Sequence, residues 1–337
     1  MNETLALIAP ESAGEVAPDS SVLGLPLIRR TVLAAPRAGF ARVAVVGADE
    51  RTRGALAGTT AEFLDAAPAG AARLPWNTVA SVKDLEPLRR GGAGTGVALR
   101  TRRDLRAAER HLLDGLIKDT EGFMSRHFER RISLAISRRL AGTSVTPNAM
   151  TIFSVVVGLV GAAFFLTPTA RSETAGALLF LLHSILDGCD GELARLRFQE
   201  SRWGGLLDFW GDNVVHVAVF STMAFGWSRA IGNPWPLLLG ALAVFGTIAS
   251  AFLVYSHTMA ESKEGPLFTS VTASGSSPLS RLADALSRRD FIYLVLILSL
   301  FGKARWFLVL AAAGAPVYFL ALTAIALAER RRPRSAS

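Results

Sequence analysis

The chain after residue 140 is dominated by long apolar segments. No charged residue occurs between Leu140 and Ala170, and five further apolar segments follow. A helix of ~20 residues crosses the hydrocarbon core of a bilayer and satisfies its own backbone hydrogen bonds there. We therefore expect a multi-pass α-helical membrane protein with six transmembrane helices, preceded by an N-terminal cytoplasmic α/β domain. The expected spans are Leu140–Ala170, Thr174–Arg195, Gly204–Trp227, Pro234–Met259, Arg289–Gly302 and Trp306–Ala328.

Basic residues are distributed unevenly between the two ends of these spans. If the acidic segment near residue 190 is cytoplasmic, thirteen Lys and Arg residues flank the inner ends and four flank the outer ends. Cytoplasmic flanks carry the excess of Lys and Arg, so both termini are expected in the cytoplasm, in a protein of the cell membrane. The inner residues are Arg138, Arg139, Arg195, Arg197, Arg202, Lys263, Arg281, Arg288, Arg289, Arg330, Arg331, Arg332 and Arg334, and the outer ones are Arg171, Arg229, Lys303 and Arg305.

Aspartates interrupt the second and third apolar segments at regular spacing. Asp187 and Asp190 are about 60° apart on a helix, while Gly204, Asp208 and Asp212 recur every four residues and share one helical face. Two helices could thus present four carboxylates to one point. An ionised Asp at the bilayer centre costs roughly 2.5–3.5 kcal/mol, so this group should lie near the interface and bind cations.

The ligand chemistry of this group indicates a hard cation. Carboxylate oxygens suit Mg²⁺, Mn²⁺ or Ca²⁺, and two divalent ions would balance four negative charges. An EF-hand calcium loop requires the pattern D-x-[DN]-x-[DN]-G, which the spacing of Asp187 and Asp190 does not match.

The complete pattern is D-x-x-D-G-x-x-A-R, then eight residues, then G-x-x-x-D-x-x-x-D. It resembles the signature of the CDP-alcohol phosphotransferases, integral membrane enzymes of phospholipid and polyol-phosphate synthesis, and it fits at every defined position. The resemblance covers roughly residues 120 to 330. It implies that a hydroxyl acceptor attacks the β-phosphorus of a CDP-alcohol, such as CDP-diacylglycerol or a CDP-polyol, and releases CMP.

The resemblance also implies roles for the acidic residues. Asp187, Asp190 and Asp208 would hold two Mg²⁺ or Mn²⁺ ions, which neutralise the diphosphate. Asp212 would be the general base and also a fourth metal ligand.

Further residues are expected around the nucleotide. Gly191, Ala194 and Gly204 lack bulk and let the nucleotide approach the backbone, while Arg195 could pair with a phosphate. Asn148, after Pro147, matches a family element near the nucleotide, although Pro147 is also explained as the first residue of a helix.

Two pairs of residues leave alternatives open. Arg288 and Arg289 could bind a phosphorylated acceptor or serve only as positive anchors at the membrane surface. His183 and His216 each lie one helical turn from an aspartate of the pattern, and could tune the site or be hydrogen-bonded without a catalytic part.

The N-terminal part indicates a domain of its own. Thr4–Ala9 and Ala41–Gly47 read as buried strands, with the helical pattern of Leu25–Ala38 between them. The segment from Gly24 to Val43 resembles sugar-phosphate nucleotidyltransferases. However, the loop Ala9–Glu15 has no Arg or Lys to hold nucleotide phosphates, so we expect a degenerate, inactive nucleotidyltransferase-like domain.

The expected organisation has three parts. Residues 1–120 form the α/β domain, 121–141 an amphipathic interfacial helix, and 142–330 the six-helix phosphotransferase domain. In the middle part Phe128, Ile132, Ile136 and Leu140 recur every four residues among arginines, which suits an anionic membrane surface or, alternatively, packing on the soluble domain.

Composition limits the kinds of molecule that the protein is expected to bind. The net charge is +8, but many basic residues flank apolar segments, which favours anionic lipids and phosphorylated substrates over nucleic acid. The single cysteine, Cys189, excludes an intrachain disulfide and a Cys-rich zinc site. No cleavable signal peptide is expected, and a homodimer is one possible assembly.

Two other classes of protein also place aspartates in membrane helices. An aromatic-acceptor prenyltransferase uses Asp-rich boxes in separate, distant helices, and an ion-coupled transporter does not need the D-G-x-x-A-R spacing. Release of CMP from a CDP-alcohol would separate all three classes.

Overall fold

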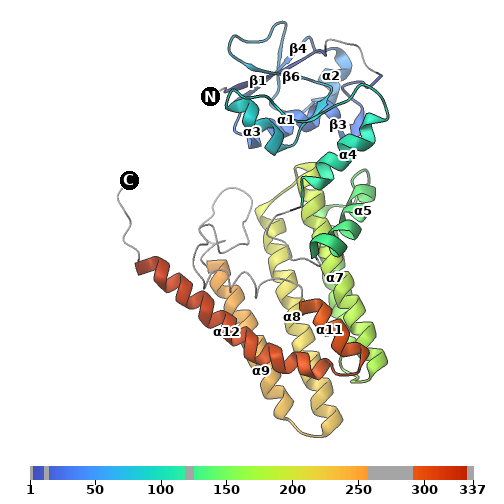
Figure 1. Ribbon diagram of the computed structural model, residues 1–337, viewed down its shortest axis with the longest axis vertical. Coiled ribbons are helices and arrows are strands. Elements are labelled where there is room, and N and C mark those ends of the chain that lie inside the picture. The colour runs from blue at the N-terminus through green and yellow to red at the C-terminus, as the bar shows by residue number, and fades with distance from the viewer. Residues whose placement is uncertain (1–2, 11–14, 118–124, 257–290, 332–337) are drawn as a thin grey trace. The chain divides into compact units, whose positions relative to one another are not determined.

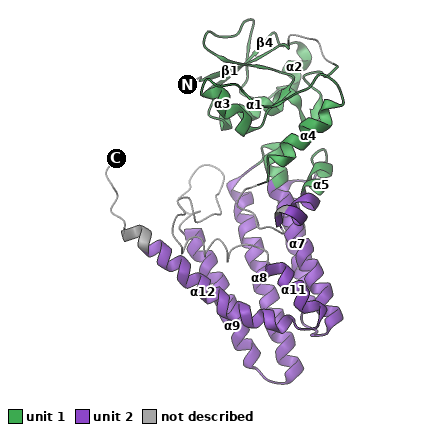
Figure 2. Cartoon of the chain, viewed as in Figure 1, with its two compact units in different colours: residues 1–119, 134–144, 192–199 green, residues 120–133, 145–191, 200–337 purple. Residues whose placement is uncertain are grey.

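The computed structural model describes residues 3–10, 15–117, 125–256 and 291–331 (Figure 1). The chain divides into two compact units (Figure 2). The first comprises Met1–Asp119, Leu134–Ser144 and Glu192–Gln199, and the second comprises Thr120–Ser133, Val145–Gly191 and Glu200–Ser337.

The first unit contains a parallel sheet of four strands in the order β5-β4-β1-β6. These strands are β1 (Thr4–Ile8), β4 (Arg42–Val46), β5 (Glu62–Leu64) and β6 (Ala72–Pro75). Strands β1 and β4 pair in parallel, with Leu5 opposite Val43, and the helix α1 (Leu27–Arg37) connects them. The predicted β-α-β beginning of this unit is confirmed.

The core of the first unit follows from its sequence pattern. Strand β1 is apolar on both faces because helices cover a parallel sheet on both sides. Leu5, Leu7, Ile28, Val43 and Val45 are buried together. The smaller elements are β2 (Ser21–Val22), β3 (Leu25–Pro26), α2 (Glu50–Ala55), β7 (Thr78–Val79), α3 (Val82–Arg89), β8 (Val97–Ala98) and α4 (Asp104–Asp114).

Arg30 of α1 is a buried cation in this unit, with 2% of its surface exposed. Its guanidinium donates to the carbonyls of Val22, Leu23 and Leu196 at 2.8, 3.1 and 2.8 Å. Burial lowers the pKa of Arg30 to about 10, which still leaves it protonated at neutral pH. Since Leu196 lies near the end of a long helix that carries the aspartates, Arg30 ties the last turn of that helix into the first unit.

That helix is α7 (Ala170–Arg197), and its end is held by further contacts within the first unit. Arg197 donates to the carbonyl of Thr143 at 2.8 Å and to that of Ala141 at 3.2 Å. Phe198 follows with a positive φ of 57°, and the guanidinium of Arg37 lies 4.8 Å from the centre of its ring.

The second unit is helical (Figure 1). Besides most of α7 it contains α6 (Pro147–Phe164), α8 (Arg202–Ile231), α9 (Trp235–Val254), α11 (Phe291–Leu300) and α12 (Ala304–Arg331). Helix α6 begins with Pro147 after the capping residue Thr146, whose hydroxyl accepts from Ala149 N at 3.2 Å. Gly232, in the left-handed conformation, ends α8.

Four of these helices are long and apolar enough to cross a membrane: α6, α8, α9 and the Ala304–Leu327 part of α12. Helix α7 is 28 residues long but carries the charged residues of the acidic pattern, and α11 has only 10 residues. Six helices are therefore present where six spans were expected, and four meet the criteria of length and composition among the described residues.

Close packing brings α6 against α7 and α8. A methyl group added at Gly158 of α6 would lie 2.7 Å from a side-chain carbon of Val215 in α8. At Gly161 it would lie 2.9 Å from Leu179 in α7. Glycine at both positions lets the helix backbones approach closely, as is common between membrane helices.

The expected amphipathic helix consists of a π-helical turn, Ser125–Glu129, followed by α5 (Arg130–Leu140). Phe128 and Ile132 are 46% and 36% exposed, whereas Glu129 is buried. Within the second unit Glu129 accepts hydrogen bonds from Tyr293 at 3.0 Å and Ser184 at 3.3 Å. Arg131, Arg138 and Arg139 are exposed as well, and Ile136 and Leu140 are half-buried, so the exposed face carries both apolar and basic side chains.

Candidate metal centre

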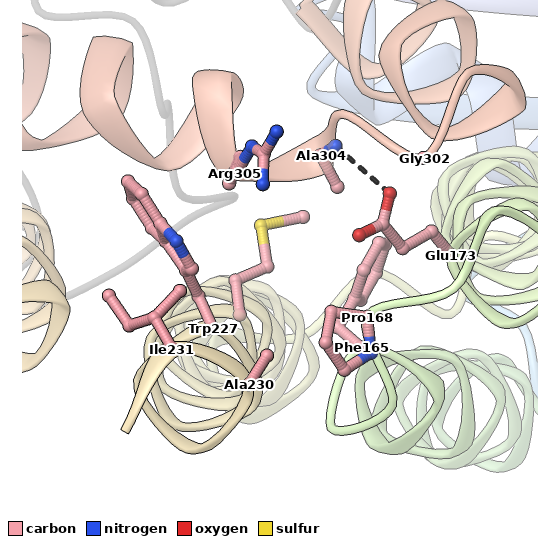
Figure 3. A pocket seen from close by; sticks show the side chains of 10 residues that line it. Phe165, Pro168, Glu173, Trp227, Ala230, Ile231, Gly302, Ala304 and Arg305 are labelled. Atoms are coloured by element: carbon pink, nitrogen blue, oxygen red, sulfur yellow. Dashed lines mark hydrogen bonds between the residues drawn. The ribbon is translucent and has the colours of Figure 1, made fainter. Parts of the chain in front are cut away.

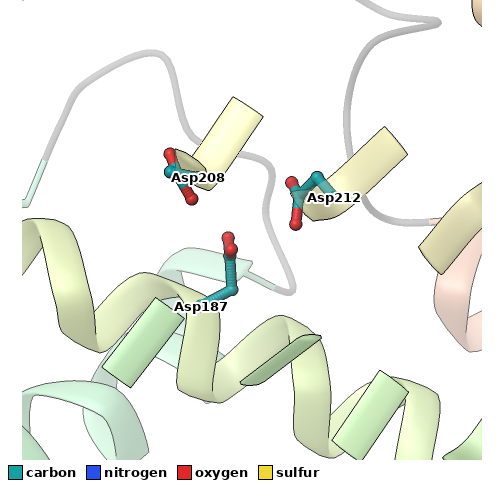
Figure 4. A group of neighbouring side chains, drawn as sticks. All are labelled: Asp187, Asp208 and Asp212. Atoms are coloured by element: carbon teal, nitrogen blue, oxygen red, sulfur yellow. The ribbon is translucent and has the colours of Figure 1, made fainter. Parts of the chain in front are cut away.

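Three aspartates of the acidic pattern converge in the second unit (Figure 4). Asp187 comes from α7, and Asp208 and Asp212 come from α8. One carboxylate oxygen of each lies within 4.8 Å of the other two. Asp187 is buried and the other two are half-buried.

Local sequence explains this convergence. The two helices are joined by residues 198–201, and Ser201 caps α8 by accepting from Gly204 N at 3.0 Å. The cap fixes where α8 starts and hence which face Asp208 and Asp212 occupy. Because these residues are four apart, both side chains point to the same neighbour.

Asp190 is the fourth predicted metal ligand, and it lies outside this group of three. It is buried, and its carboxylate accepts a hydrogen bond from the hydroxyl of Thr151 in α6 and from the backbone N–H of Gly191. The structure therefore brings three of the four predicted ligands together and turns the fourth toward α6. The physical reason is the offset of about 60° between Asp187 and Asp190 around α7.

The three converging residues fit a divalent cation. Oδ1 of Asp208 is buried and receives no hydrogen bond from any described residue. Three neighbouring carboxylates repel one another unless a cation or protons lie between them, and oxygen ligands are those that Mg²⁺ and Mn²⁺ prefer. Asp187, Asp208 and Asp212 are thus the residues that would hold the metal.

The residues predicted to lie near the nucleotide include Asn148, Gly191 and Gly204. Asn148 lies against Gly204, where an added methyl group would be 3.1 Å from its side-chain oxygen. The first turn of α6 and the glycine of the pattern are therefore neighbours. Gly191 is half-buried one residue after Asp190.

Two further predicted site residues lie in α7, and two lie outside the described residues. Ala194 and Arg195 are half-buried in α7, within the segment Glu192–Gln199 that belongs to the first unit. Arg288 and Arg289, predicted to bind an acceptor, lie outside the described residues. Cys189 is fully buried and contacts the carbonyls of Ser133 and Ile185.

Sequence reasoning missed Thr151 and gave no definite role to His183. Nε2 of His183 lies 3.4 Å from Oδ1 of Asp212. The spacing of four between His183 and Asp187 placed the histidine near the site, but its contact with α8 depends on helix packing. No pattern in the sequence marked Thr151, because a single threonine in an apolar helix is ordinary.

A pocket lies at the other ends of these helices (Figure 3). Its lining includes Phe165, Glu173, Trp227 and Arg305. Glu173 accepts from the backbone N–H of Ala304 at 3.0 Å and so caps the start of α12. Since Glu173 precedes Asp187 by fourteen residues of one helix, ~21 Å along its axis, this pocket is separate from the carboxylates.

A cluster of carboxylates held by long apolar helices defines a membrane protein with a site for a divalent cation. The chain belongs to the CDP-alcohol phosphatidyltransferase family, whose sequence pattern matches residues 144–328. The predicted family is thereby confirmed.

Three relatives illustrate the similarity. The chain is 35% identical to the bifunctional IPC transferase and DIPP synthase of Thermococcus kodakarensis over 45% of this chain and 34% of the relative. It is 34% identical to the phosphatidylinositol phosphate synthase of Mycobacteroides abscessus over 32% of this chain and 49% of the relative. The crystal structure of the phosphatidylinositol phosphate synthase of Mycobacterium tuberculosis with CDP-DAG bound is 21% identical, with a TM-score of 0.38 over 56% of this chain and 92% of that one.

The matched region spans about a third of the length of the bifunctional enzymes.

Proposed function

We propose that this protein transfers a substituted phosphate group from a CDP-alcohol to a hydroxyl acceptor and releases CMP. The observation that carries the proposal is the convergence of Asp187, Asp208 and Asp212 within 4.8 Å, inside the region that matches the family. The donor would be CDP-diacylglycerol or a CDP-polyol, in phospholipid or inositol-phosphate-type synthesis. Relatives named as an IPC transferase and a phosphatidylinositol phosphate synthase support this range of substrates.

The family uses divalent metals, and the residues present suit Mg²⁺ or Mn²⁺. When bound, the metal would neutralise the diphosphate of the donor and the charge on the departing CMP. Asp187, Asp208 and Asp212 would hold one ion, and Asp190 would serve a second. Thr151 would orient Asp190 for this purpose through its hydroxyl.

Asp212 is proposed to act also as the general base. The hydroxyl oxygen of the acceptor forms a bond to the β-phosphorus, the bond from that phosphorus to CMP breaks, and the hydroxyl proton passes to Asp212. Gly204 and Asn148 would border the cytidine side of the site, with Gly191, Ala194 and Arg195 following along α7. The assignment of a phosphorylated acceptor to Arg288 and Arg289 rests on their place in the sequence alone.

We further propose that all six helices α6, α7, α8, α9, α11 and α12 cross the membrane, with both termini in the cytoplasm. The acidic residues of α7 then lie at its cytoplasmic end, where water and metal ions reach them. Residues 1–119 would form an inactive nucleotidyltransferase-like unit. In support, Arg29 donates to the carbonyls of Ala55 and Ala57, and Arg30 donates to those of Val22, Leu23 and Leu196, so both guanidiniums are engaged by backbone carbonyls.

The test is CMP release by the purified full-length protein, with a panel of CDP-alcohols and hydroxyl acceptors. We expect release to require both substrates, to stop when EDTA removes the metal, and to return with Mg²⁺ or Mn²⁺. An unaltered rate in EDTA, or no release with any CDP-alcohol, would contradict the proposal.

A further inference from the structure

The pocket of Figure 3 lies where several helices of the second unit end. Helices α6 and α8 end beside it, and α7 and α12 begin there. Trp227 lines the pocket, Trp235 at the start of α9 lies against it with ring centroids 4.6 Å apart, and Trp306 in the first turn of α12 is 55% exposed. Tryptophan is enriched where a bilayer meets water, so the pocket is expected at the level of the lipid headgroups.

Glu173 contributes a negative charge to this pocket. The residue is only 4% exposed, and one of its carboxylate oxygens accepts a hydrogen bond from the backbone N–H of Ala304 at 3.0 Å. The other oxygen accepts no hydrogen bond from any described residue and points into the pocket (Figure 3). Since a buried carboxylate is costly unless it is paired, this oxygen offers a binding position for a cationic group.

Arg305 contributes the opposite charge. Its exposed side chain lines the pocket and lies across it from Glu173 (Figure 3). The guanidinium forms neither an ion pair nor a hydrogen bond with Glu173 or with any other residue in the described part of the chain. Its donors match the oxygens of a phosphate group, so an anion can bind to Arg305 while a cation binds to Glu173.

The lining between these two charges is largely apolar. Phe165 and Met223 are buried there, and the half-buried indole of Trp227 is held edge to face against Trp235. Of the aromatic side chains, Trp attracts ammonium groups most strongly. A ligand that carries both an ammonium and an anionic group would therefore satisfy both charges of the pocket.

We propose that this pocket binds a zwitterionic aminophosphate, the group found in the headgroup of an ethanolamine phospholipid. The ammonium would contact the second carboxylate oxygen of Glu173 beside Trp227, and the phosphate would contact Arg305. An anionic lipid lacks the ammonium and a metal ion lacks the phosphate, so neither uses both charges. The inference goes beyond the proposed transfer reaction and does not depend on which side of the membrane the pocket faces.

The test is isothermal titration of the purified full-length protein in a non-ionic detergent. The probes are a short-chain phosphatidylethanolamine, the phosphatidylglycerol of the same chain length, and free phosphoethanolamine. Glu173→Gln removes the charge but keeps a carbonyl oxygen for the N–H of Ala304, and Arg305→Gln removes the guanidinium. Lys303→Gln is the matched control, because Lys303 is an exposed cation two residues from Arg305 that does not line the pocket.

We expect the wild type to prefer phosphatidylethanolamine over phosphatidylglycerol by about tenfold or more. Glu173→Gln should lose this preference, whereas Arg305→Gln should weaken the binding of both lipids. Each loss should be about 10- to 100-fold, as for the removal of one charge-assisted hydrogen bond, and Lys303→Gln should resemble the wild type. If free phosphoethanolamine binds as tightly as the lipid and with the same losses, the ligand is a soluble aminophosphate; if it binds more weakly, the ligand is the lipid.

Four results would overturn the inference. They are no binding of either aminophosphate, equal wild-type affinity for the two lipids, wild-type affinity in either pocket variant, or an equal loss in Lys303→Gln. Thermal midpoints accompany each titration. If Glu173→Gln lowers the midpoint because the start of α12 is disturbed, Arg305→Gln decides alone, since its exposed side chain can be replaced without breaking a contact within the described residues.

Discussion

Replacing Thr151 by Val should impair the metal centre without changing its ligands. Thr151 is 2% exposed, and its hydroxyl donates to the buried carboxylate of Asp190. The same hydroxyl lies 3.2 Å from the carbonyl of Pro147, but it has one hydrogen and the charged acceptor is the stronger partner. Valine has nearly the same shape, so the main change is the loss of this donor.

The magnitude follows from the burial of both groups. Asp190 is 6% exposed, so water replaces the lost donor poorly. A hydrogen bond to a charged group contributes about 1.5–3 kcal/mol, which corresponds to roughly a ten- to hundredfold change in an equilibrium or rate constant. For Thr151→Val we therefore expect kcat/KM for CMP release to fall by this factor, with a higher Mg²⁺ concentration needed for half-maximal rate.

The assay is initial CMP release by purified protein over a range of Mg²⁺ concentrations, with Thr151→Ser as the matched control. Serine keeps the hydroxyl and should remain within about threefold of the wild type, because only a methyl group is removed. The reasoning is refuted if the Val variant keeps the wild-type Mg²⁺ dependence, or if the Ser variant loses as much activity as the Val variant.

Three further predictions concern the acidic group, the first unit and the topology. Asp212→Asn should abolish CMP release while Mn²⁺ still binds through Asp187 and Asp208, more weakly than in the wild type, whereas Asp187→Asn should weaken Mn²⁺ binding further; wild-type turnover by Asp212→Asn would remove it as the base. Arg30→Met leaves three backbone carbonyls without their donor and should destabilise the first unit by at least about 3 kcal/mol, seen as a lower unfolding midpoint; an unchanged midpoint would contradict this. A cysteine replacing Arg171 should react with an impermeant reagent from outside the cell and one replacing Lys263 should not, and the reverse pattern would invert the proposed orientation.

Much of the fold could be predicted from the sequence because it depends on local patterns. The apolar segments placed α8 within a few residues of its ends and enclosed α6 and α9, since a helix in lipid must consist of consecutive apolar residues. The two apolar runs flanking a helical pattern likewise predicted β1, α1 and β4. The prediction of a membrane span was less definite for α7, because the charged residues of the acidic pattern lie in the same helix as the apolar segment.

The chemistry of the site could also be predicted largely from the sequence. The spacing of Asp208 and Asp212 predicted that both lie on one face of α8. Few residues separate them from Asp187 in the sequence, so the connection between the two helices had to be short. Oxygen ligands alone indicated a hard divalent cation, whatever the tertiary structure. The family pattern, confirmed over residues 144–328, depends on the same fixed spacing.

Tertiary structure decided which side chains meet across helices. Asp187 and Asp190 are offset by about 60° around α7, so Asp187 faces α8 and Asp190 faces Thr151 of α6. This division follows from how α6 and α8 pack against α7. The same packing brings Asn148 to Gly204 and His183 to Asp212, pairs that lie 56 and 29 residues apart in the sequence. Sequence periodicity determines the face of a helix on which a residue lies. Which residue of another helix it contacts depends on how the helices pack. Glycines such as Gly158 decide this packing, because the missing side chain lets two helices approach closely.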